Sequence, residues 1–259
     1  MDKRPIGIFD SGIGGTSIYK EIRNLLPNED FIYLADSANA PYGNKSDDKI
    51  LSLSIKNTEL LLKYNVKLVV VACNTATTNA IKSLRKTYNI PFIGIEPAIK
   101  PASLNTKTKA IGILATKGTL TSELFHNTVN LYGNGITVIE KVGDGIVPLI
   151  ESGKTDSDQM RILLRKHLEP MLEAEIDYLV LGCTHYPYLM PLLLELLPDS
   201  IKIIDSGEAV ARQTKAILKK KRLINSLSNK GTSKFFTNGN VAILISILND
   251  NSLVSYMDF

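Results

Sequence analysis

VVACNT at residues 70–75 and VLGCTH at residues 180–185 are two similar stretches in which an apolar run ends in a cysteine and polar residues follow. Each run is typical of a buried strand in a parallel sheet, and the residues after it are typical of a helix start. Cys73 and Cys183 are the only cysteines of the chain. A helix N-terminus lowers the pKa of a thiol placed there. The repetition therefore predicts one active thiol from each half of an α/β protein.

Short β-type runs alternate with helical patterns along the rest of the chain, as they do where helices join parallel strands. The sequence predicts strands at residues 6–9, 31–34, 68–72, 92–95, 111–114, 136–140, 178–182 and 201–204. A helix is predicted over residues 46–64, because Ser46 can cap its first turn and Asp47 and Asp48 favour the positive end of its dipole.

The two halves of the chain also echo one another. IGIF at residues 6–9 and IGIL at residues 111–114 each precede one of the cysteine stretches. IGIEPA at residues 93–98 and IIDSGEA at residues 203–209 each follow one. Two pseudo-symmetric α/β lobes with largely parallel sheets explain this repeat.

We expect the active site in the cleft between these lobes, where the carboxyl ends of both sets of strands converge. Residues 1–95 together with 206–259 are predicted to form the first lobe, which carries Cys73. Residues 96–205 are predicted to form the second lobe, which carries Cys183. The chain would then cross between the lobes twice.

Composition narrows the functional classes. The 259 residues, 44% of them hydrophobic, suffice for two modest cores. No apolar stretch reaches the roughly 18 to 20 residues that span a bilayer, and the first residues do not read as a signal sequence. We therefore expect a cytoplasmic protein with no membrane partner. Two cysteines in a chain of this size fit a reducing compartment with free thiols better than a structural disulfide.

The net charge of +4 raises the question of nucleic-acid binding, most directly through KKKR at residues 219–222. This run closes a predicted helix over residues 206–223, where cations stabilise the negative end of the dipole. No aromatic residues interleave with it to stack on bases. A solvated helix end is favoured, and we expect no nucleic-acid partner but a mild attraction for acidic small molecules.

Two loops carry turn formers and polar groups. DSGIGGT at residues 10–16 fails as a dinucleotide fingerprint, because Ser17 stands where a glycine is needed and no P-loop lysine follows. Its glycines would let backbone amides and Ser11 approach a small anion such as a carboxylate, although a turn without a ligand has the same sequence. ADSANAPYG at residues 35–43 is a candidate specificity loop.

Four motifs, taken together and in this order, resemble the cofactor-independent aspartate/glutamate racemase family, and within it the members that act on glutamate. They are IFDSGIGG at 8–15, the loop from Ala35-Asp36 to Pro41-Tyr42-Gly43, ACNTA at 72–76 and LGCTHYP at 181–187. The resemblance extends from residue 6 to about residue 218.

Racemisation removes the Cα proton from one face of the amino acid and delivers a proton to the other, so it needs two acid/base groups. The resemblance implies that Cys73 takes the proton from D-glutamate and Cys183 takes it from L-glutamate, without any cofactor or metal. It also implies that the reaction supplies D-glutamate for peptidoglycan, the bacterial cell wall polymer. The protein is further expected to form a homodimer.

The same resemblance implies the remaining site residues. Asp10 would assist on the Cys73 side, and His185 and Glu151 would assist on the Cys183 side. The substrate would be bound by Asp10 and His185, with the side-chain carboxylate at Ser11, Tyr42 and Gly43 and the α-carboxylate at Asn74, Thr75 and Thr184.

Other interpretations stay open at this point. Cys73, Cys183, His185 and Asp10 could hold a metal, or the two thiols could form a redox pair. The chain could be a binding module for small anions whose cysteines are buried apolar residues. Glu151 could be an ordinary helix-end residue. Among enzymes, the alternative is a racemase for aspartate or another acidic amino acid.

Overall fold

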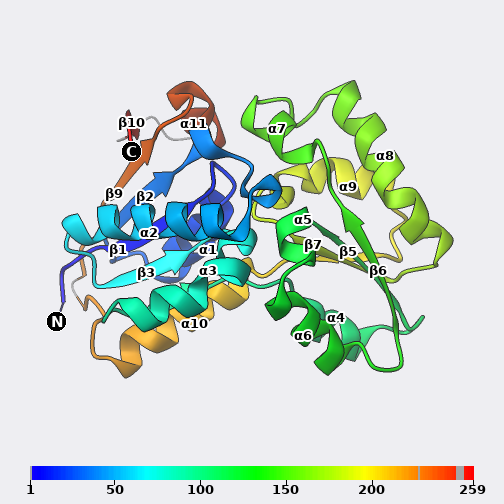
Figure 1. The fold of residues 1–259 in the computed structure, drawn as a ribbon, viewed down its shortest axis with the longest axis horizontal. Helices are drawn as coiled ribbons and strands as arrows, with labels where there is room; N and C mark the ends of the chain where they lie inside the picture. The colour runs from blue at the N-terminus through cyan, green and yellow to red at the C-terminus, as the bar shows by residue number, and fades with distance from the viewer. Residues whose placement is uncertain (1, 227, 249–253) are drawn as a thin grey trace.

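The computed structural model describes residues 2–226, 228–248 and 254–259, which form two lobes lying side by side (Figure 1). The first lobe holds a six-stranded sheet in the order β10-β9-β2-β1-β3-β4, and the second holds a four-stranded sheet in the order β6-β5-β7-β8. Every strand pair in both sheets is parallel. The predicted fold class, two α/β lobes with parallel sheets, is confirmed.

The strands are β1 (Ile6–Asp10), β2 (Phe31–Ala35), β3 (Leu68–Val71), β4 (Phe92–Gly94), β5 (Ala110–Ala115), β6 (Thr137–Val142), β7 (Tyr178–Gly182), β8 (Lys202–Ile204), β9 (Ser233–Thr237) and β10 (Val254–Tyr256). The longer helices are α1 (Thr16–Leu25), α2 (Asp47–Lys63), α3 (Asn74–Thr87), α6 (Glu123–Tyr132), α8 (Asp158–Glu173), α10 (Gly207–Lys220) and α11 (Val241–Leu248). The shorter ones are α4 (Ile99–Asn105), α5 (Lys117–Leu120), α7 (Ile146–Glu151) and α9 (Met190–Leu196), with 3-10 turns η1 (Ser37–Asn39), η2 (Tyr42–Asn44) and η3 (Tyr186–Leu189).

All eight predicted strands are present, with ends displaced by at most two residues. The predicted helix over 46–64 is α2, and Ser46 caps it by accepting a hydrogen bond from the Lys49 amide. Strands β9 and β10 were not predicted, because one is only partly buried and the other has three residues, so neither produces a clear apolar pattern.

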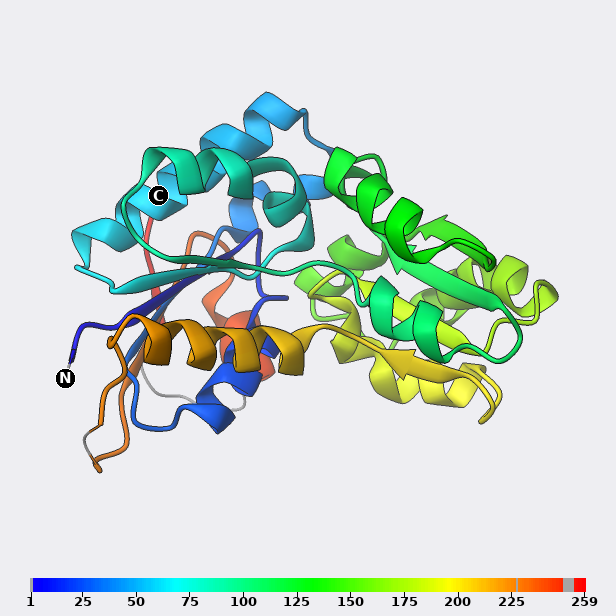
Figure 2. The ribbon, with the colours of Figure 1, turned by 90° about the horizontal axis from the view of Figure 1, so that it is seen from below.

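Helices cover both faces of each sheet, as a parallel sheet requires (Figure 2). In the first lobe, α1 and α10 pack together on one face and α2 and α3 pack together on the other. Valines and isoleucines of β1 and β3 are fully buried between these layers. Helix α10 ends in the lysine run that the sequence places at a solvated helix end.

The chain passes between the lobes twice, once between β4 and α4 and again between β8 and α10. The two crossings touch, because the Ser206 hydroxyl donates a hydrogen bond to the Glu96 carbonyl. The lobe boundaries at 95/96 and 205/206 stay a prediction, and residues 1, 227 and 249–253 of the predicted first lobe lie outside the described residues. In the part of the chain that the structure describes, every helix is too short or too polar to cross a membrane.

Candidate active site

The carboxyl ends of the two sheets face each other and bring the two cysteines to one place. In the first lobe, β1 pairs with β3, and the residues at their ends are Asp10 and Cys73. In the second lobe, β5 pairs with β7, and Thr116 and Cys183 follow their ends. Parallel neighbours end at one edge of a sheet, so each edge supplies one thiol and one polar partner.

A small cavity lies between the lobes. Cys73 and Cys183 both line it, and each is more than nine-tenths buried. The other lining residues are Ser11, Pro41, Tyr42, Gly43, Asn74, Thr75, Thr116, Val147, Thr184 and His185. Every residue that the resemblance assigns to substrate binding therefore lies on the cavity wall, apart from Asp10, which lies behind it.

Cys73 caps helix α3, and its Sγ accepts a hydrogen bond from the Ala76 amide at 3.4 Å. Its thiol also donates to the Ser11 hydroxyl, with 3.6 Å between sulfur and oxygen. Burial raises the pKa of Cys73, and the negative charge of Asp10 adds to that increase, whereas the hydrogen bond from the Ala76 amide opposes it. The net shift is upward, so the expectation that the helix N-terminus lowers this pKa is wrong: desolvation outweighs the dipole.

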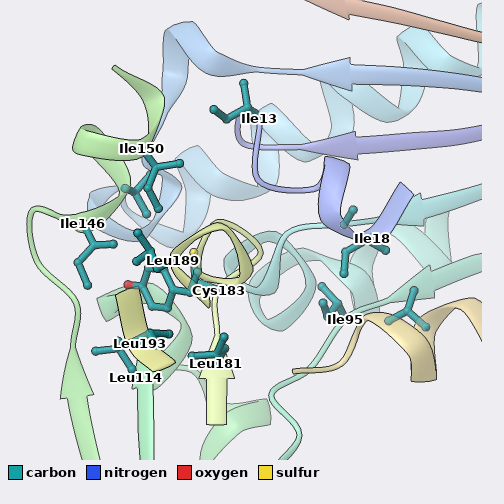
Figure 3. Packing of buried hydrophobic residues seen from close by; sticks show 14 of the residues in the cluster. Ile13, Ile18, Ile95, Leu114, Ile146, Ile150, Leu181, Cys183, Leu189 and Leu193 are labelled. Atoms are coloured by element: carbon teal, nitrogen blue, oxygen red, sulfur yellow. The ribbon is translucent and has the colours of Figure 1, made fainter. Parts of the chain in front are cut away.

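Cys183 has different surroundings. The predicted helix start after it is a turn followed by the 3-10 segment η3, so Cys183 caps no α-helix. Its sulfur lies 3.8 Å from Nδ1 of His185. On its apolar side it belongs to the same buried cluster as Ile146, Ile150 and Leu189 (Figure 3). The thiol is therefore screened from water on one side and faces an acid/base group on the other.

His185 connects Cys183 to a carboxylate. Its Nε2 lies 2.6 Å from Oε1 of Glu151. Burial alone would lower the pKa of His185, but its hydrogen bonds to Cys183 and Glu151 and the charges of these partners raise it well above the usual value. The imidazole is therefore a proton carrier within reach of the second thiol.

Glu151, the last residue of α7, joins the lobes. Its Oε1 also accepts the Ile13 amide at 2.7 Å, and its Oε2 accepts the Ser37 hydroxyl at 2.8 Å. Its side chain is only 13% exposed, which is unlike a solvated helix-end glutamate. The structure places Glu151 one contact away from Cys183, with His185 between them.

Asp10 is fully buried and has partners in both lobes. Its Oδ2 accepts the amides of Gly12 and Gly15, and its Oδ1 accepts the Thr184 hydroxyl at 3.2 Å. Burial raises its pKa to about 6, against the positive charge of His185 and the two amide bonds, which lower it. The charge of Asp10 thus raises the pKa of Cys73, and the hydrogen bond from Thr184 connects Asp10 to the second lobe.

The glycine turn at residues 12–15 serves the protein's own side chains. The amides of Gly12 and Gly15 donate to Asp10, and the Ile13 amide donates to Glu151. The Gly14 nitrogen lies 3.3 Å from Nε2 of His185. The amides of residues 12, 13 and 15 are thus engaged by the protein's own side chains, whereas Ser11, the other group expected at a small anion, lines the cavity. A Cβ added at Gly12 would lie 1.8 Å from Oε1 of Glu151, so only glycine permits this approach.

Pro41, Tyr42 and Gly43 form one side of the cavity. The Tyr42 hydroxyl points away from the cavity, since it donates to Oδ2 of Asp36 at 2.5 Å and accepts from Nδ2 of Asn57 at 3.0 Å. This hydroxyl is already engaged. Tyr42 and Gly43 therefore line the cavity without offering it this hydroxyl.

Asn74 and Thr116 also line the cavity. Both polar atoms of the Asn74 amide are buried and have no hydrogen-bond partner among the described residues, so they are available to a ligand. The Thr116 hydroxyl lies 2.7 Å from the Thr75 hydroxyl across the lobes. Thr116 was missed, although the repeat contains its signal: IGILAT at 111–116 aligns with IGIFDS at 6–11, and Thr116 then matches Ser11.

Replacing Asp10 with asparagine is expected to stabilise the protein above about pH 6. The raised pKa means that the folded state holds the Asp10 proton more tightly than the unfolded chain, whose value is 3.8. The contribution of Asp10 to the free energy of unfolding is therefore fully present below pH 3.8 and is lost as the pH rises to about 6. The loss amounts to about 3 kcal/mol, which the neutral asparagine avoids. Urea unfolding of both proteins across this pH range measures it.

Asp177→Asn is the matched control and has the opposite sign. Asp177 loses some solvation, but bonds from Thr106, Lys107 and Thr108 outweigh this and lower its pKa. Its carboxylate stabilises the fold at neutral pH and loses that effect in acid. The variant should be less stable than the parent at neutral pH. If Asp10→Asn were as destabilised at neutral pH as Asp177→Asn, the claim that the charged Asp10 carboxylate destabilises the folded protein would be contradicted.

The two thiols and their neighbours do not resemble a metal centre. Within residues 2–226, 228–248 and 254–259, no group of three or more His, Cys, Asp or Glu side chains is arranged to hold a metal ion. Both cysteines are free.

Comparison with known proteins was made on sequence and on structure. The family model described as Asp/Glu/Hydantoin racemase matches residues 6–214. A glutamate racemase from Herpetosiphon aurantiacus is 43% identical over 93% of this chain and 95% of its own length.

Solved structures give the same result. Glutamate racemase isoform RacE1 from Bacillus anthracis superposes with a TM-score of 0.90 at 30% identity, covering 100% of this chain and 99% of that one. A glutamate racemase from Francisella tularensis in complex with D-glutamate has a TM-score of 0.85 at 27% identity, covering 100% and 98% of the two chains.

Proposed function

Because the chain belongs to the Asp/Glu/Hydantoin racemase family, we propose that it interconverts L-glutamate and D-glutamate by proton transfer at Cα between Cys73 and Cys183. One observation supports this proposal above all others: the two thiols come from opposite lobes and line the same small cavity. A carbon atom held between them can lose a proton to one thiolate and gain one from the other thiol.

The proton balance closes without a cofactor. In one direction, the Cys183 thiolate takes the Cα proton of L-glutamate and the Cys73 thiol donates its proton to the opposite face, which yields D-glutamate. Cys73 is then the thiolate and Cys183 the thiol, so the reverse reaction starts from this state. The raised pKa of Cys73 agrees with a thiol that begins the L-to-D direction protonated.

The assisting residues differ between the two sides. His185, held by Glu151, can exchange a proton with Cys183 or with the substrate ammonium. Asp10 has no hydrogen bond to Cys73 but places a carboxyl group close behind it. The Cα proton of an amino acid is a weak acid, so the buried setting and the fixed dipoles around it must lower much of the barrier.

Substrate recognition is assigned to neutral polar groups of residues that line the cavity. We assign the side-chain carboxylate of glutamate to Ser11 and the backbone amides of Tyr42 and Gly43. The α-carboxylate is assigned to Asn74, Thr75 and Thr184, of which Asn74 has both amide atoms available. Neutral donors bind an anion without adding further buried charge.

Incubation with L-glutamate in deuterated water tests the function. The circular dichroism of the amino acid should fall to zero while deuterium enters at Cα, because an equal mixture of enantiomers has no optical activity. L-Aspartate serves as the comparison substrate and should change far more slowly. A constant signal with no deuterium uptake would instead support a binding module, and faster loss with aspartate would reassign the substrate.

The cellular role is part of the proposal. D-Glutamate made by this reaction would supply peptidoglycan synthesis, as the resemblance implies. The two free thiols fit a reducing compartment, so we place the reaction in the cytoplasm. A homodimer stays a prediction that sedimentation equilibrium would test.

A further inference from the structure

Asp36 is a buried carboxylate that the proposed chemistry leaves unused, and it lies directly behind the loop at residues 41–43. It follows strand β2 and is fully buried. Its two oxygens accept hydrogen bonds from Asn39, Tyr42, Lys56, Asn57 and Asn238. A buried carboxylate with so many partners is held firmly in place.

The bond to Tyr42 links this carboxylate to the cavity wall. The Tyr42 hydroxyl donates to Asp36 at 2.5 Å, and Asn57 donates to both of these groups. Pro41 and Gly43 have no polar side-chain atoms, so the Tyr42 hydroxyl is the only side-chain hydrogen-bonding group of residues 41–43. That hydroxyl is therefore the side-chain hydrogen bond that ties residues 41–43 to the Asp36 cluster.

The loop has little freedom to adjust on its other side. A Cβ added at Gly43 would lie 2.7 Å from Cβ of Thr116 in the second lobe, and one added at Gly118 would lie 3.3 Å from Cα of Gly43. Residues 41–43 thus lie between the second lobe and the Asp36 cluster. Loss of the anchor would let the loop shift toward the Asp36 cluster, and with it the part of the cavity wall formed by Tyr42 and Gly43.

We propose that Asp36 is a positioning residue for the substrate: through the Tyr42 hydroxyl it fixes the backbone amides of Tyr42 and Gly43 where the side-chain carboxylate of glutamate binds. This inference rests on the proposed function. Lys56 donates to both oxygens of Asp36 and Asn238 donates to Oδ1, so these bonds hold the carboxylate in place independently of Tyr42. The reacting Cα lies at the other end of the substrate, between the thiols.

The test is a double-mutant cycle with Tyr42→Phe, Asp36→Asn and the combined variant. Each single change should raise KM for glutamate about 10-fold and leave kcat nearly unchanged, because the affected amides contact the substrate far from Cα. The combined variant should also show an increase of about 10-fold, since both changes break the same link. L- and D-glutamate have equal free energies, so kcat/KM must fall by the same factor in both directions.

Tyr88→Phe is the matched control. The Tyr88 hydroxyl also donates to a carboxylate of the first lobe, Oε1 of Glu59 at 3.1 Å, but at the end of α3 away from Cys73. Its KM and kcat should equal those of the parent. A purely structural role of Asp36 would reduce the active fraction and thus kcat, with KM constant.

Three results would overturn the inference. They are a KM that stays at the parent value in both single variants, a loss confined to kcat, and a combined variant whose KM rises about 100-fold as two independent effects would. The proposed function fails in a different way, because the parent protein itself would then not racemise glutamate. The parent assay therefore separates the two failures.

Discussion

Replacing either Cys73 or Cys183 with alanine is expected to slow the inversion of glutamate by about 10³-fold or more, because each change removes one of two obligatory proton carriers. The remaining thiol should still work on its own face. In deuterated water, Cys183→Ala should exchange the Cα hydrogen of D-glutamate without inversion, and Cys73→Ala should exchange that of L-glutamate. Proton NMR follows the exchange, and circular dichroism follows the inversion.

Each cysteine variant serves as the experimental control for the other, because the two should exchange the Cα hydrogen of opposite enantiomers of glutamate. Unchanged far-ultraviolet circular dichroism and melting temperature would show that each variant is folded. Both cysteines are more than nine-tenths buried, and the loss of one sulfur should cost only a small part of the stability. Full inversion by either variant would contradict the two-thiol mechanism.

A methyl group at Gly14 is expected to lower the inversion rate by about 10²-fold, the effect of displacing one proton-transfer group. The added Cβ would lie 2.2 Å from Nδ1 of His185, where no atom can remain. The imidazole is buried and bound to Glu151, so it must turn away from Cys183 or push the turn outward. Overpacking of this kind also costs about 1–3 kcal/mol of stability.

Deuterium exchange locates the damage caused by Gly14→Ala. Exchange of L-glutamate, which is assigned to Cys183, should fall more than exchange of D-glutamate, which is assigned to Cys73. Gly207→Ala is the control, since its added Cβ would meet nothing closer than 3.0 Å and lies outside the cavity. Equal losses for both enantiomers would indicate that the turn, and not His185, had moved.

The sequence predicts those parts of the fold and the site that depend on neighbours along the chain. Apolar runs show the eight predicted strands, and the residue after each run locates Cys73 and Cys183 at the sheet edges. His185 is two residues from Cys183, so their contact follows from local geometry. Parallel pairing then requires that the strand ends meet.

Contacts between distant segments leave no such pattern. Ile13 and Glu151 are separated by 138 residues, and Asp36 and Asn238 by 202, yet each pair shares a hydrogen bond. The amides of the glycine turn therefore looked free for a ligand when they are bound to the protein itself. The pKa of Cys73 was misjudged for a related reason, because burial by both lobes, and not the helix start alone, determines it.

The order of strands in the first sheet has a consequence for synthesis on the ribosome. Strands β5 to β8 of the second sheet are consecutive in the chain, so this sheet can form as soon as it has emerged. Strand β9, by contrast, pairs with β2 across most of the sequence. The first lobe, whose synthesis begins before that of the second, is therefore completed after it. Until β9 is made, β2 has an unpaired edge that favours aggregation. We expect nascent chains that stop before residue 233 to need chaperone protection.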